Sequence, residues 1–239
     1  MADIFSIALS GLNASRNRML TAANNLANLN TPGYKAQRAD SAALPGGNGA
    51  ATDSVSFSPQ AGALVPTGDP LDLAIAGEGY FQVADGTGGV AYARDGSFRP
   101  DSNGTLVNSQ GMPLSPAITV PPNAARVSIG EDGTVTANMA DGTTANLGQI
   151  QLTRFNNPGG LSRQGGNLLT PTPAAGTPQS GAPGTAGRGA ILSGYLESSN
   201  VNIAEEVITL LNEENMTKAN AAVVRTADAM QKTLLDVKA

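Results

Sequence analysis

The sequence contains no cysteine and no histidine. Without cysteine, disulfide bonds and thiol chemistry are excluded, and the chain is compatible with either a reducing or an oxidising compartment. Without histidine, the usual general base near neutral pH and the commonest metal ligand are both missing, which excludes the familiar catalytic triads. The sequence therefore offers few of the side chains on which enzymes and metalloproteins usually depend.

Aromatic and charged residues are also scarce. Only 4% of the 239 residues are aromatic, so any core must be built from small aliphatic side chains. Charged residues make up 14%, the formal net charge is −5, and lysine and arginine do not cluster. Since binding to nucleic-acid phosphates depends on such clusters, we expect no nucleic-acid partner. The length suits one ordinary domain with extensions, or two small domains.

Long hydrophobic runs are missing as well. Nothing in the sequence approaches the roughly 18 consecutive apolar residues of a membrane span. Asp3 stands where a secretory signal would carry positive charge, and no apolar run with a cleavage site follows it. We therefore expect no membrane span and no cleaved signal peptide, so export would have to use another route.

Two long amphipathic helices are predicted, one at each end of the chain. In residues 3–29 and again in residues 202–237, apolar residues recur at gaps of three and four, which places them on a helix face. Pro32 and Gly33 end the first helix, since proline lacks a backbone donor and glycine tolerates a positive φ. A polar run at 212–215 interrupts the second stripe. From these stripes we predict an assembly interface made of Phe5, Leu9, Leu12, Met19 and Leu26 on the first helix and Val207, Leu211, Val223, Met230 and Leu234 on the second.

The surroundings of these stripes favour assembly over simple burial. Burial against the helix's own domain is the default for an amphipathic helix. However, the first helix carries almost no charge on its opposite face, with only Arg16 and Arg18 after Asp3. The second helix, at about 1.5 Å per residue, would be roughly 50 Å long. We therefore predict that the helices pair as a coiled-coil-like domain and that their stripes form an interface with neighbouring subunits.

The middle of the chain predicts an antiparallel all-β module of short strands, which makes the fold class α+β. Apolar and other residues alternate from Leu71 to Ile75, as in a half-buried strand. Dipeptides typical of hairpin turns then recur as Asp85-Gly86, Asp95-Gly96, Asn103-Gly104, Asp132-Gly133 and Asp141-Gly142. The pattern leaves open whether the module is a barrel or a sandwich. It also leaves open whether residues 170–189 are a disordered linker or an extended chain laid over the module.

Four segments follow from these patterns. Residues 1–35 hold the first helix, 36–68 form a connecting segment that is mobile or extended over 41–52, 69–195 form the β-rich module, and 196–239 hold the second helix. In the connecting segment we expect short strands only at 55–58 and 62–65.

A search for catalytic, cofactor-binding or metal-binding residues finds no convincing set. No phosphate-binding loop is present, and the glycine-rich segments 77–79 and 184–189 do not open a helix after a strand. The carboxylates that could in principle serve a glycosidase are Asp69, Asp72, Asp95, Asp101 and Asp132. Nearly all of them stand beside glycine, proline or asparagine, so turn formation explains them better. Segment 95–104 also lacks the spacing and closing glutamate of a calcium-binding EF-hand.

Three segments resemble motifs of one protein family. The first motif consists of Ala23, Asn24, Asn25, Leu26, Ala27 and Asn28, followed by Thr31, Pro32, Gly33, Tyr34 and Lys35. The second is Glu78–Val83 with Tyr92–Phe98, and the third is Leu196–Asn202. In this order, and over nearly the whole chain, they resemble the rod and hook family of bacterial flagellar axial proteins. Residues 120–133 and 148–161 are most similar to its distal rod branch.

The resemblance implies a structural subunit of the flagellar basal-body rod, which polymerises into a helical tube and transmits torque without being an enzyme. It also implies an inner tube of terminal helices, type III export without a cleaved signal, and a periplasmic location. The implied partners are copies of itself, other rod subunits, the hook protein, the surrounding ring proteins and a rod-capping protein, with no cofactor or small-molecule substrate. A proximal rod or hook-type subunit stays open within the family. An adhesin or other carbohydrate-binding module, and a secreted enzyme, stay open as other classes.

Overall fold

The computed structural model describes residues 2–45, 49–86 and 88–237, without the side chains of residues 2, 3, 53, 234, 235 and 237. The chain divides into two compact units. The helical unit comprises residues 1–29, 36–58 and 201–239, and the β unit comprises residues 30–35 and 59–200. The combination of terminal helices and an antiparallel β region confirms the predicted α+β class.

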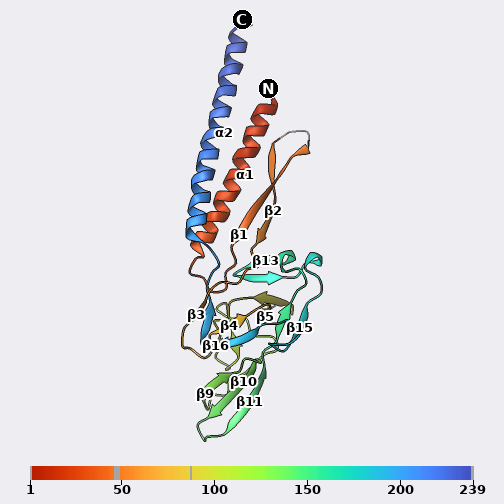
Figure 1. Ribbon diagram of the computed structural model, residues 1–239, viewed down its shortest axis with the longest axis vertical. Coiled ribbons are helices and arrows are strands. Elements are labelled where there is room, and N and C mark those ends of the chain that lie inside the picture. Colours follow the sequence, from red (N-terminus) through yellow and green to blue (C-terminus); the bar gives the residue numbers. More distant parts are fainter. Residues whose placement is uncertain (1, 46–48, 87, 238–239) are drawn as a thin grey trace. The chain divides into compact units, whose positions relative to one another are not determined.

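Two long helices dominate the helical unit, α1 (Ala2–Ala27) and α2 (Ile203–Val237). They run side by side in opposite directions (Figure 1). Glu205 and Glu206 stand in the first turn of α2, where negative charge is favoured by the helix dipole. Asn202 accepts a hydrogen bond from the backbone of Ala204 at 3.0 Å and so satisfies one of the free donors at the start of α2.

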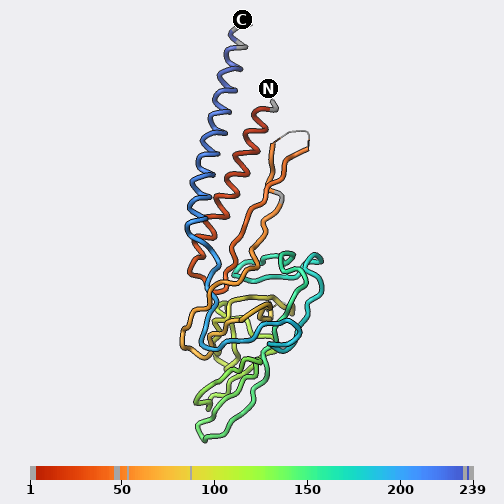
Figure 2. Tube along the Cα trace, in the orientation of Figure 1, coloured from red at the N-terminus to blue at the C-terminus, as the bar shows by residue number. Residues whose placement is uncertain are grey.

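A hairpin of β1 (Gln37–Ala43) and β2 (Ala50–Phe57) completes the helical unit. It lies along α1 (Figure 2), and the Asn17 side chain donates to Thr52 Oγ1 at 2.9 Å. For the region of this hairpin, the sequence predicted one strand, over 55–58, with a mobile or extended segment before it. The structure differs because these strands pair through their backbones and are rich in alanine and serine. They lack the apolar alternation that sequence analysis detects.

The β unit is built from short antiparallel strands. One sheet has six strands in the order β13-β14-β6-β5-β12-β15, and a second has three in the order β11-β10-β9. The pairs β16-β4, β17-β3 and β7-β8 are two-stranded. The strands are β3 (Leu64–Pro66), β4 (Leu73–Ala76), β5 (Tyr80–Ala84), β6 (Val90–Ala93), β7 (Arg99–Pro100), β8 (Leu106–Val107), β9 (Ala124–Ile129), β10 (Thr134–Met139), β11 (Thr144–Gln149), β12 (Leu152–Arg154), β13 (Ser162–Gly165), β14 (Leu168–Thr170), β15 (Gln179–Gly181), β16 (Ala190–Ser193) and β17 (Tyr195–Glu197).

The segment after β12 is ordered on the β unit. It contains the short 3-10 helices η2 (Pro158–Gly160) and η3 (Pro173–Ala175). Strand β15 pairs with the edge of β12, and Gly189 donates to the carbonyl of Glu78 at 2.7 Å. Of the two alternatives for residues 170–189, the extended chain laid over the module is therefore the one that the structure has.

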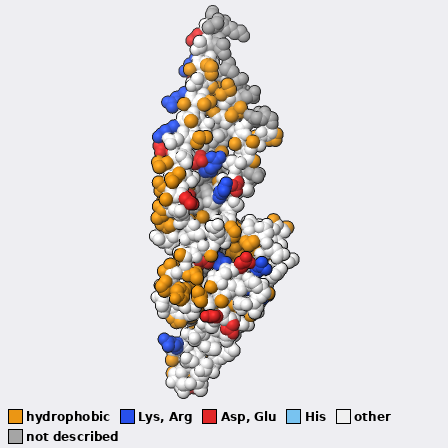
Figure 3. All heavy atoms as spheres, viewed as in Figure 1, with side chains coloured by type: hydrophobic (Ala, Val, Ile, Leu, Met, Phe, Trp, Pro, Cys, Tyr) orange, Lys and Arg blue, Asp and Glu red, His pale blue; other side chains and the backbone are white. Residues whose placement is uncertain are grey.

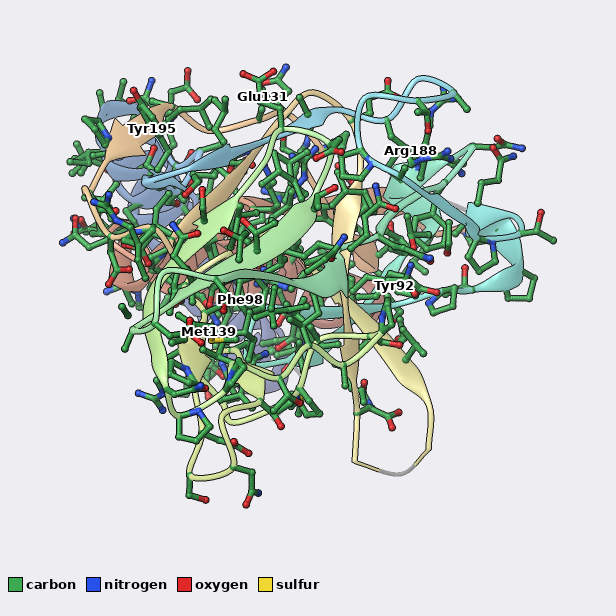
Figure 4. All side chains as sticks on the ribbon, turned by 90° about the horizontal axis from the view of Figure 1, so that it is seen from below. Tyr92, Phe98, Glu131, Met139, Arg188 and Tyr195 are labelled. Atoms are coloured by element: carbon green, nitrogen blue, oxygen red, sulfur yellow. The ribbon has the colours of Figure 1, made fainter. Side chains whose placement is uncertain are left out.

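The core of the β unit is apolar and closely packed. Phe81, Leu73 and Leu152 are completely buried, and the rings of Phe81 and Phe98 meet edge to face at 5.3 Å. A second edge-to-face contact joins Tyr92 and Phe155 at 4.9 Å. Tyr92 and Phe98 are labelled in Figure 4. Each aromatic side chain buries a large apolar area, so these few rings add substantially to a core that is otherwise built of aliphatic residues.

Candidate functional site

The contact between α1 and α2 repeats every seven residues. Asn25 Nδ2 donates to Glu206 Oε1 at 2.8 Å, and seven residues away on each helix Arg18 pairs with Glu213 at 2.8 Å. In each pair the two residue numbers sum to the same value, as expected for antiparallel helices in a constant register. A repeat of seven residues is the period at which two helices keep the same faces in contact.

The next step of this register brings Gly11 against Asn220. A methyl group on Gly11 would lie 2.8 Å from Asn220 Nδ2, so glycine permits this close approach. The buried residues along the seam between the helices are small or polar. They are Ala8, Ser15, Ala22 and Asn25 on α1 and Glu213 and Ala227 on α2. The seam therefore fixes the register through polar contacts while burying little apolar area.

The residues predicted to form the assembly interface lie beside this seam. On α1, Leu9 is 58% exposed, whereas Phe5, Leu12, Met19 and Leu26 are half-buried. On α2, the exposed residues are Val207, Leu211, Val223 and Met230, with exposed fractions between 41% and 54%. Leu234 lies outside the residues whose side chains the structure describes. Figure 3 shows hydrophobic side chains spread over the visible face of the helices.

The α2 residues of this set occupy two faces of the helix. At about 100° per residue, Val207 and Leu211 point roughly 130° away from Val223 and Met230. The polar run at 212–215 marks the change of face. Further large apolar side chains, outside the ten residues predicted for the assembly interface, are also exposed. They are Ile4, Ile7, Leu20, Ile203, Ile208 and Met216. The helical unit thus presents apolar groups on more than one side.

Within the first family motif, Asn25 is the residue with the clearest structural role. It is fully buried, its Nδ2 donates to the carbonyl of Gln37 at 2.8 Å, and its Oδ1 accepts from the backbone nitrogen of Gln37 at the same distance. Because Nδ2 also donates to Glu206, one amide joins α1, β1 and α2. Asparagine suits this position because it is both donor and acceptor. By contrast, Ala23, Asn24 and Ala27 are exposed.

The later part of the motif takes part in an ionic cluster of the β unit, which we call the latch: Gly33, Lys35, Arg94 and Glu197. Lys35 Nζ donates to Glu197 Oε1, and Arg94 donates to Glu197 Oε2 at 3.2 Å. The backbone nitrogen of Gly33 donates to the Glu197 carbonyl at 2.7 Å, and that of Gly62 donates to Oε1 at 2.9 Å. The side chains of Lys35, Arg94 and Glu197 are all at least nine-tenths buried.

The electrostatics of the latch depend on a single carboxylate. Burial lowers the pKa of the Lys35 ammonium. The negative charge of Glu197 opposes this shift, and the positive charge of Arg94 reinforces it. Arg94 also donates to the carbonyl of Gly77 at 2.7 Å, and Lys35 donates to that of Gln60 at 2.7 Å. The buried charges are thus paired and further hydrogen-bonded, the condition under which such groups are tolerated inside a protein.

Neighbouring contacts hold the same chain segments. The guanidinium of Arg163 lies over the Tyr34 ring at 4.5 Å, and Arg163 donates to the Lys35 carbonyl at 3.2 Å. Asn167 Nδ2 donates to the Pro32 carbonyl at 2.9 Å. Thr31 and Pro32 are themselves only half-buried. All three segments that carry the family resemblance contribute a residue to the latch, a meeting that sequence spacing alone could not reveal.

Four of the five candidate aspartates, Asp69, Asp95, Asp101 and Asp132, accept hydrogen bonds within turns, whereas Asp72 forms a β-bridge with Ser97. Asp95 Oδ1 accepts from the backbone of Ser97 at 3.0 Å, and Asp101 Oδ1 accepts from Asn103 and Thr105 at 2.8 Å. Hydrogen bonds from Thr134 hold the pKa of Asp132 below its usual value. Among the described residues, no group of three or more acidic side chains could hold a metal ion. Neither described helix is long and apolar enough to cross a membrane.

Comparison with known proteins gives a consistent class. Residues 5–35 match a family model described as "Flagella basal body rod protein". Residues 74–137 match the "Flagellar hook protein FlgE/F/G D1 domain", and residues 192–237 match the "Flagellar basal body rod FlgEFG protein C-terminal". These models cover the N-terminal helix, much of the β unit and the C-terminal helix, and they define a protein of the bacterial flagellar axis.

Several curated relatives match almost the whole chain. The flagellar basal-body rod protein FlgG of Buchnera aphidicola subsp. Schizaphis graminum is 36% identical over 251 residues, covering 95% of this chain and 96% of the relative. FlgG of Bacillus subtilis is 34% identical, covering 96% and 97%. FlgF of Mesorhizobium japonicum is 30% identical, covering 94% and 93%. The chain belongs to the flagellar basal-body rod protein family, whose members are structural proteins, and it is not an enzyme.

Proposed function

We propose that this protein is a subunit of the flagellar basal-body rod and that it polymerises through its terminal helices into a helical tube. The observation that carries this proposal is the contrast within the helical unit between a small, polar seam and large exposed apolar side chains. Exposed apolar groups of this number are typical of a surface that a partner covers. The names of the relatives, all rod proteins, support the same function.

We further propose that α1 and α2 behave as an antiparallel coiled coil. The seven-residue repeat of the contacts Asn25–Glu206, Arg18–Glu213 and Gly11–Asn220 supports this pairing. If the register continues, residues beyond about position 229 of α2 extend past the start of α1. Met230 lies in this extension, and a helix end without a partner is marginal in water. A neighbouring subunit would supply the missing contact.

The latch supports a mechanical role in this proposal. The chain passes between the units near residues 30, 36, 59 and 201. Within the β unit, the latch and its neighbours hold Pro32–Lys35, Gln60–Gly62 and Glu197–Asn200 together. A rod that transmits torque needs such chain segments to resist displacement. We therefore assign the latch the role of keeping the β unit fixed on the segments that lead to the helices.

Similarity to FlgG favours the distal rod, whereas the FlgF relative and the shared FlgE/F/G domains keep a proximal or hook-type position as the second candidate. The expected partners are copies of this chain, other rod subunits, the hook protein, the surrounding ring proteins and a rod-capping protein. The expected route is export without a cleaved signal peptide to the periplasmic rod.

Polymerisation of the purified full-length chain tests the proposal. Paired substitutions Leu9→Ser and Leu211→Ser should prevent sedimentable polymers from forming, because each removes a large exposed apolar group. The matched control changes Asn13→Ser and Asn212→Ser, two exposed polar positions on the same helices. Deleting residues 1–30 or 203–239 should also stop polymerisation. Normal polymerisation of either truncated chain would contradict the proposal, as would equal effects of the apolar and polar substitutions.

A further inference from the structure

A groove with an acidic excess lies within the helical unit, between β1 and the two helices. Its volume is about 650 Å³. Its charged lining residues are Arg18, Arg38, Asp40, Glu205, Glu206 and Glu213. Four carboxylates therefore face two guanidinium groups. Figure 3 shows acidic and basic side chains mixed over the lower half of the helical unit in this view.

Both arginines of the groove already form ion pairs, which leaves two glutamates without a counter-charge in the described chain. Arg18 pairs with Glu213, and Arg38 pairs with Asp40 at 2.9 Å. Glu205 and Glu206 have no ion pair among the described residues. Glu213 is only 7% exposed, and its second oxygen, Oε2, has no hydrogen-bond partner in the described part of the chain. A buried carboxylate oxygen without a donor is costly, so the groove is incomplete as it stands.

The charge missing from the groove is present at the other end of α2. Four glutamates, Glu205, Glu206, Glu213 and Glu214, stand near the start of this helix. The cations Lys218, Arg225 and Lys232 follow them, together with Asp228 and Asp236. These three cations are seven residues apart and so lie on one face. Lys218 pairs with Glu214 and Lys232 pairs with Asp228. Arg225 is exposed, and among the described residues it forms no ion pair.

Arg225 cannot reach the groove of its own subunit. It stands twelve residues after Glu213 on one continuous helix, which separates them by about 18 Å along the axis. An arginine side chain is far shorter than this distance. The two complementary features can therefore meet only between two copies of the chain.

We propose that the acidic groove binds the Arg225 guanidinium of a second copy, a contact that rests on the proposed polymerisation. Guanidinium suits the groove because its five donors can serve several carboxylates at once. Two parallel copies joined in this way are displaced along the helix axis by roughly 18–30 Å, the separation of Arg225 from Glu213 and Glu205 within one helix. The contact thus sets the axial displacement between neighbours, which the apolar side chains alone leave unspecified.

Introduced cysteines test the proximity directly, because the natural sequence contains none. The double variant Glu205→Cys with Arg225→Cys is polymerised and then oxidised. Within one copy these positions are about 30 Å apart along α2, whereas a disulfide requires Cα atoms within about 7 Å. Cross-linked dimers and ladders on a non-reducing gel can therefore arise only between copies. The matched control is Glu205→Cys with Arg16→Cys, since Arg16 is also exposed and without an ion pair among the described residues.

Each outcome of the cross-linking bears on the proposal. Ladders from the Arg225 variant but not from the Arg16 control support it. Ladders from the control alone, or from neither variant while both polymerise, overturn it and assign the groove to another cation or another partner. If the unmodified chain does not polymerise at all, the proposed function fails and the contact fails with it, so the two failures are distinguishable.

A charge exchange measures the same contact without cysteine. Arg225→Glu and Glu205→Arg, each alone, should raise the critical concentration for polymerisation by about tenfold, since each places like charges together. The two changes combined should restore polymerisation to within about twofold, because the charges are then exchanged across the contact. Arg16→Glu, the matched control, should have no comparable effect. A double variant as defective as the single variants would overturn the proposal.

Discussion

The two units use the same kinds of side chain in opposite ways. In the β unit, Leu73, Phe81 and Leu152 are completely buried. In the helical unit, Leu9 and Leu211 are more than half exposed, although they belong to the longest regular elements of the chain. Charged groups show the same contrast. Both oxygens of the buried Glu197 accept hydrogen bonds, whereas Glu213 has one oxygen without a donor in the described chain.

This contrast indicates where each unit completes its core. The β unit buries a continuous apolar core and pairs its buried carboxylate Glu197 with two cations, although Arg94 Nε has no hydrogen-bond partner among the described residues, so we expect it to be folded in a single molecule. The helical unit fixes its register internally but leaves its apolar groups to be covered from outside. Its full stability should therefore depend on protein concentration, as expected for a chain whose folded form is completed by association.

The largest expected effect comes from removing the carboxylate of the latch. Glu197→Ala leaves Lys35 and Arg94 buried without a counter-charge, which should destabilise the β unit by about 3–5 kcal/mol. Chemical denaturation with hydrogen exchange of the β-unit amides measures this loss. Glu131→Ala is the control, because Glu131, labelled in Figure 4, is exposed. A loss of unfolding free energy no larger than that of the control would show that the latch does not stabilise the β unit.

A second substitution pair compares apolar residues between the units. Phe81→Ala should cost about 3–5 kcal/mol in dilute solution, because it opens a cavity in a closely packed core. Leu211→Ala should change the stability of the dilute chain by less than about 0.5 kcal/mol, since its side chain is already exposed. Denaturation followed by circular dichroism measures both.

In polymerisation, Leu211→Ala should have a larger effect than Phe81→Ala. Leu211→Ala should raise the critical concentration although the dilute chain is unchanged. If Leu211→Ala destabilises the dilute chain as strongly as Phe81→Ala does, then the helical unit is already complete alone, and the contrast drawn between the units is wrong.

Gly33 offers a smaller test of the latch, through its backbone. Its φ is +65°, and a methyl group there would lie 2.4 Å from the backbone nitrogen of Asp95. Gly33→Ala should therefore cost about 2–4 kcal/mol, from strain together with displacement of the latch. Gly86→Ala is a matched control, since Gly86 also has a positive φ of 74° but open space around it. That control should cost only about 1 kcal/mol. Equal losses in the two variants would show that the close approach to Asp95 has no cost.

Sequence periodicity was sufficient for the elements that obey it. The helix beginning near residue 2 and ending before Pro32, the second helix from 203, and the strands near Leu73 and Tyr80 all follow from apolar spacing or turn residues. Strands β1 and β2 were largely missed because their pairing is carried by the backbone.

The candidate site was predictable only in part. Apolar residues spaced three and four positions apart identified the apolar face of α1, whose role in assembly stays a prediction. The same spacing could not identify the seam between α1 and α2, because small and polar residues such as Gly11, Ala22 and Asn25 add little to an apolar pattern. Nor could it pair Lys35 with Glu197, since these residues are 162 positions apart and meet only through the folded β unit.

The smallest expected effect concerns Glu206. Its substitution should act differently on the helical unit of the dilute chain and on that of the polymer. Burial raises the pKa of this carboxyl above the ordinary glutamate value, with Asn25 opposing and Glu205 reinforcing the shift. Because the pKa of Glu206 is higher in the folded chain than in the unfolded chain, the protonated carboxyl favours folding. This contribution is present at acid pH and is lost as the pH rises through the folded-state pKa. In dilute solution, Glu206→Gln should therefore stabilise the helices near pH 7, by only about a few tenths of a kcal/mol after solvent screening.

The difference should disappear below about pH 4, where the carboxyl is protonated in both folded and unfolded chains. Thermal unfolding by circular dichroism at several pH values measures it. Glu214→Gln is a control of opposite sign, because a hydrogen bond from Lys218 holds the pKa of Glu214 below its usual value. If an arginine of a second copy occupies the groove, Glu206→Gln should weaken the polymer while strengthening the dilute chain. A change of the same sign in both states would mean that Glu206 belongs to the single subunit alone.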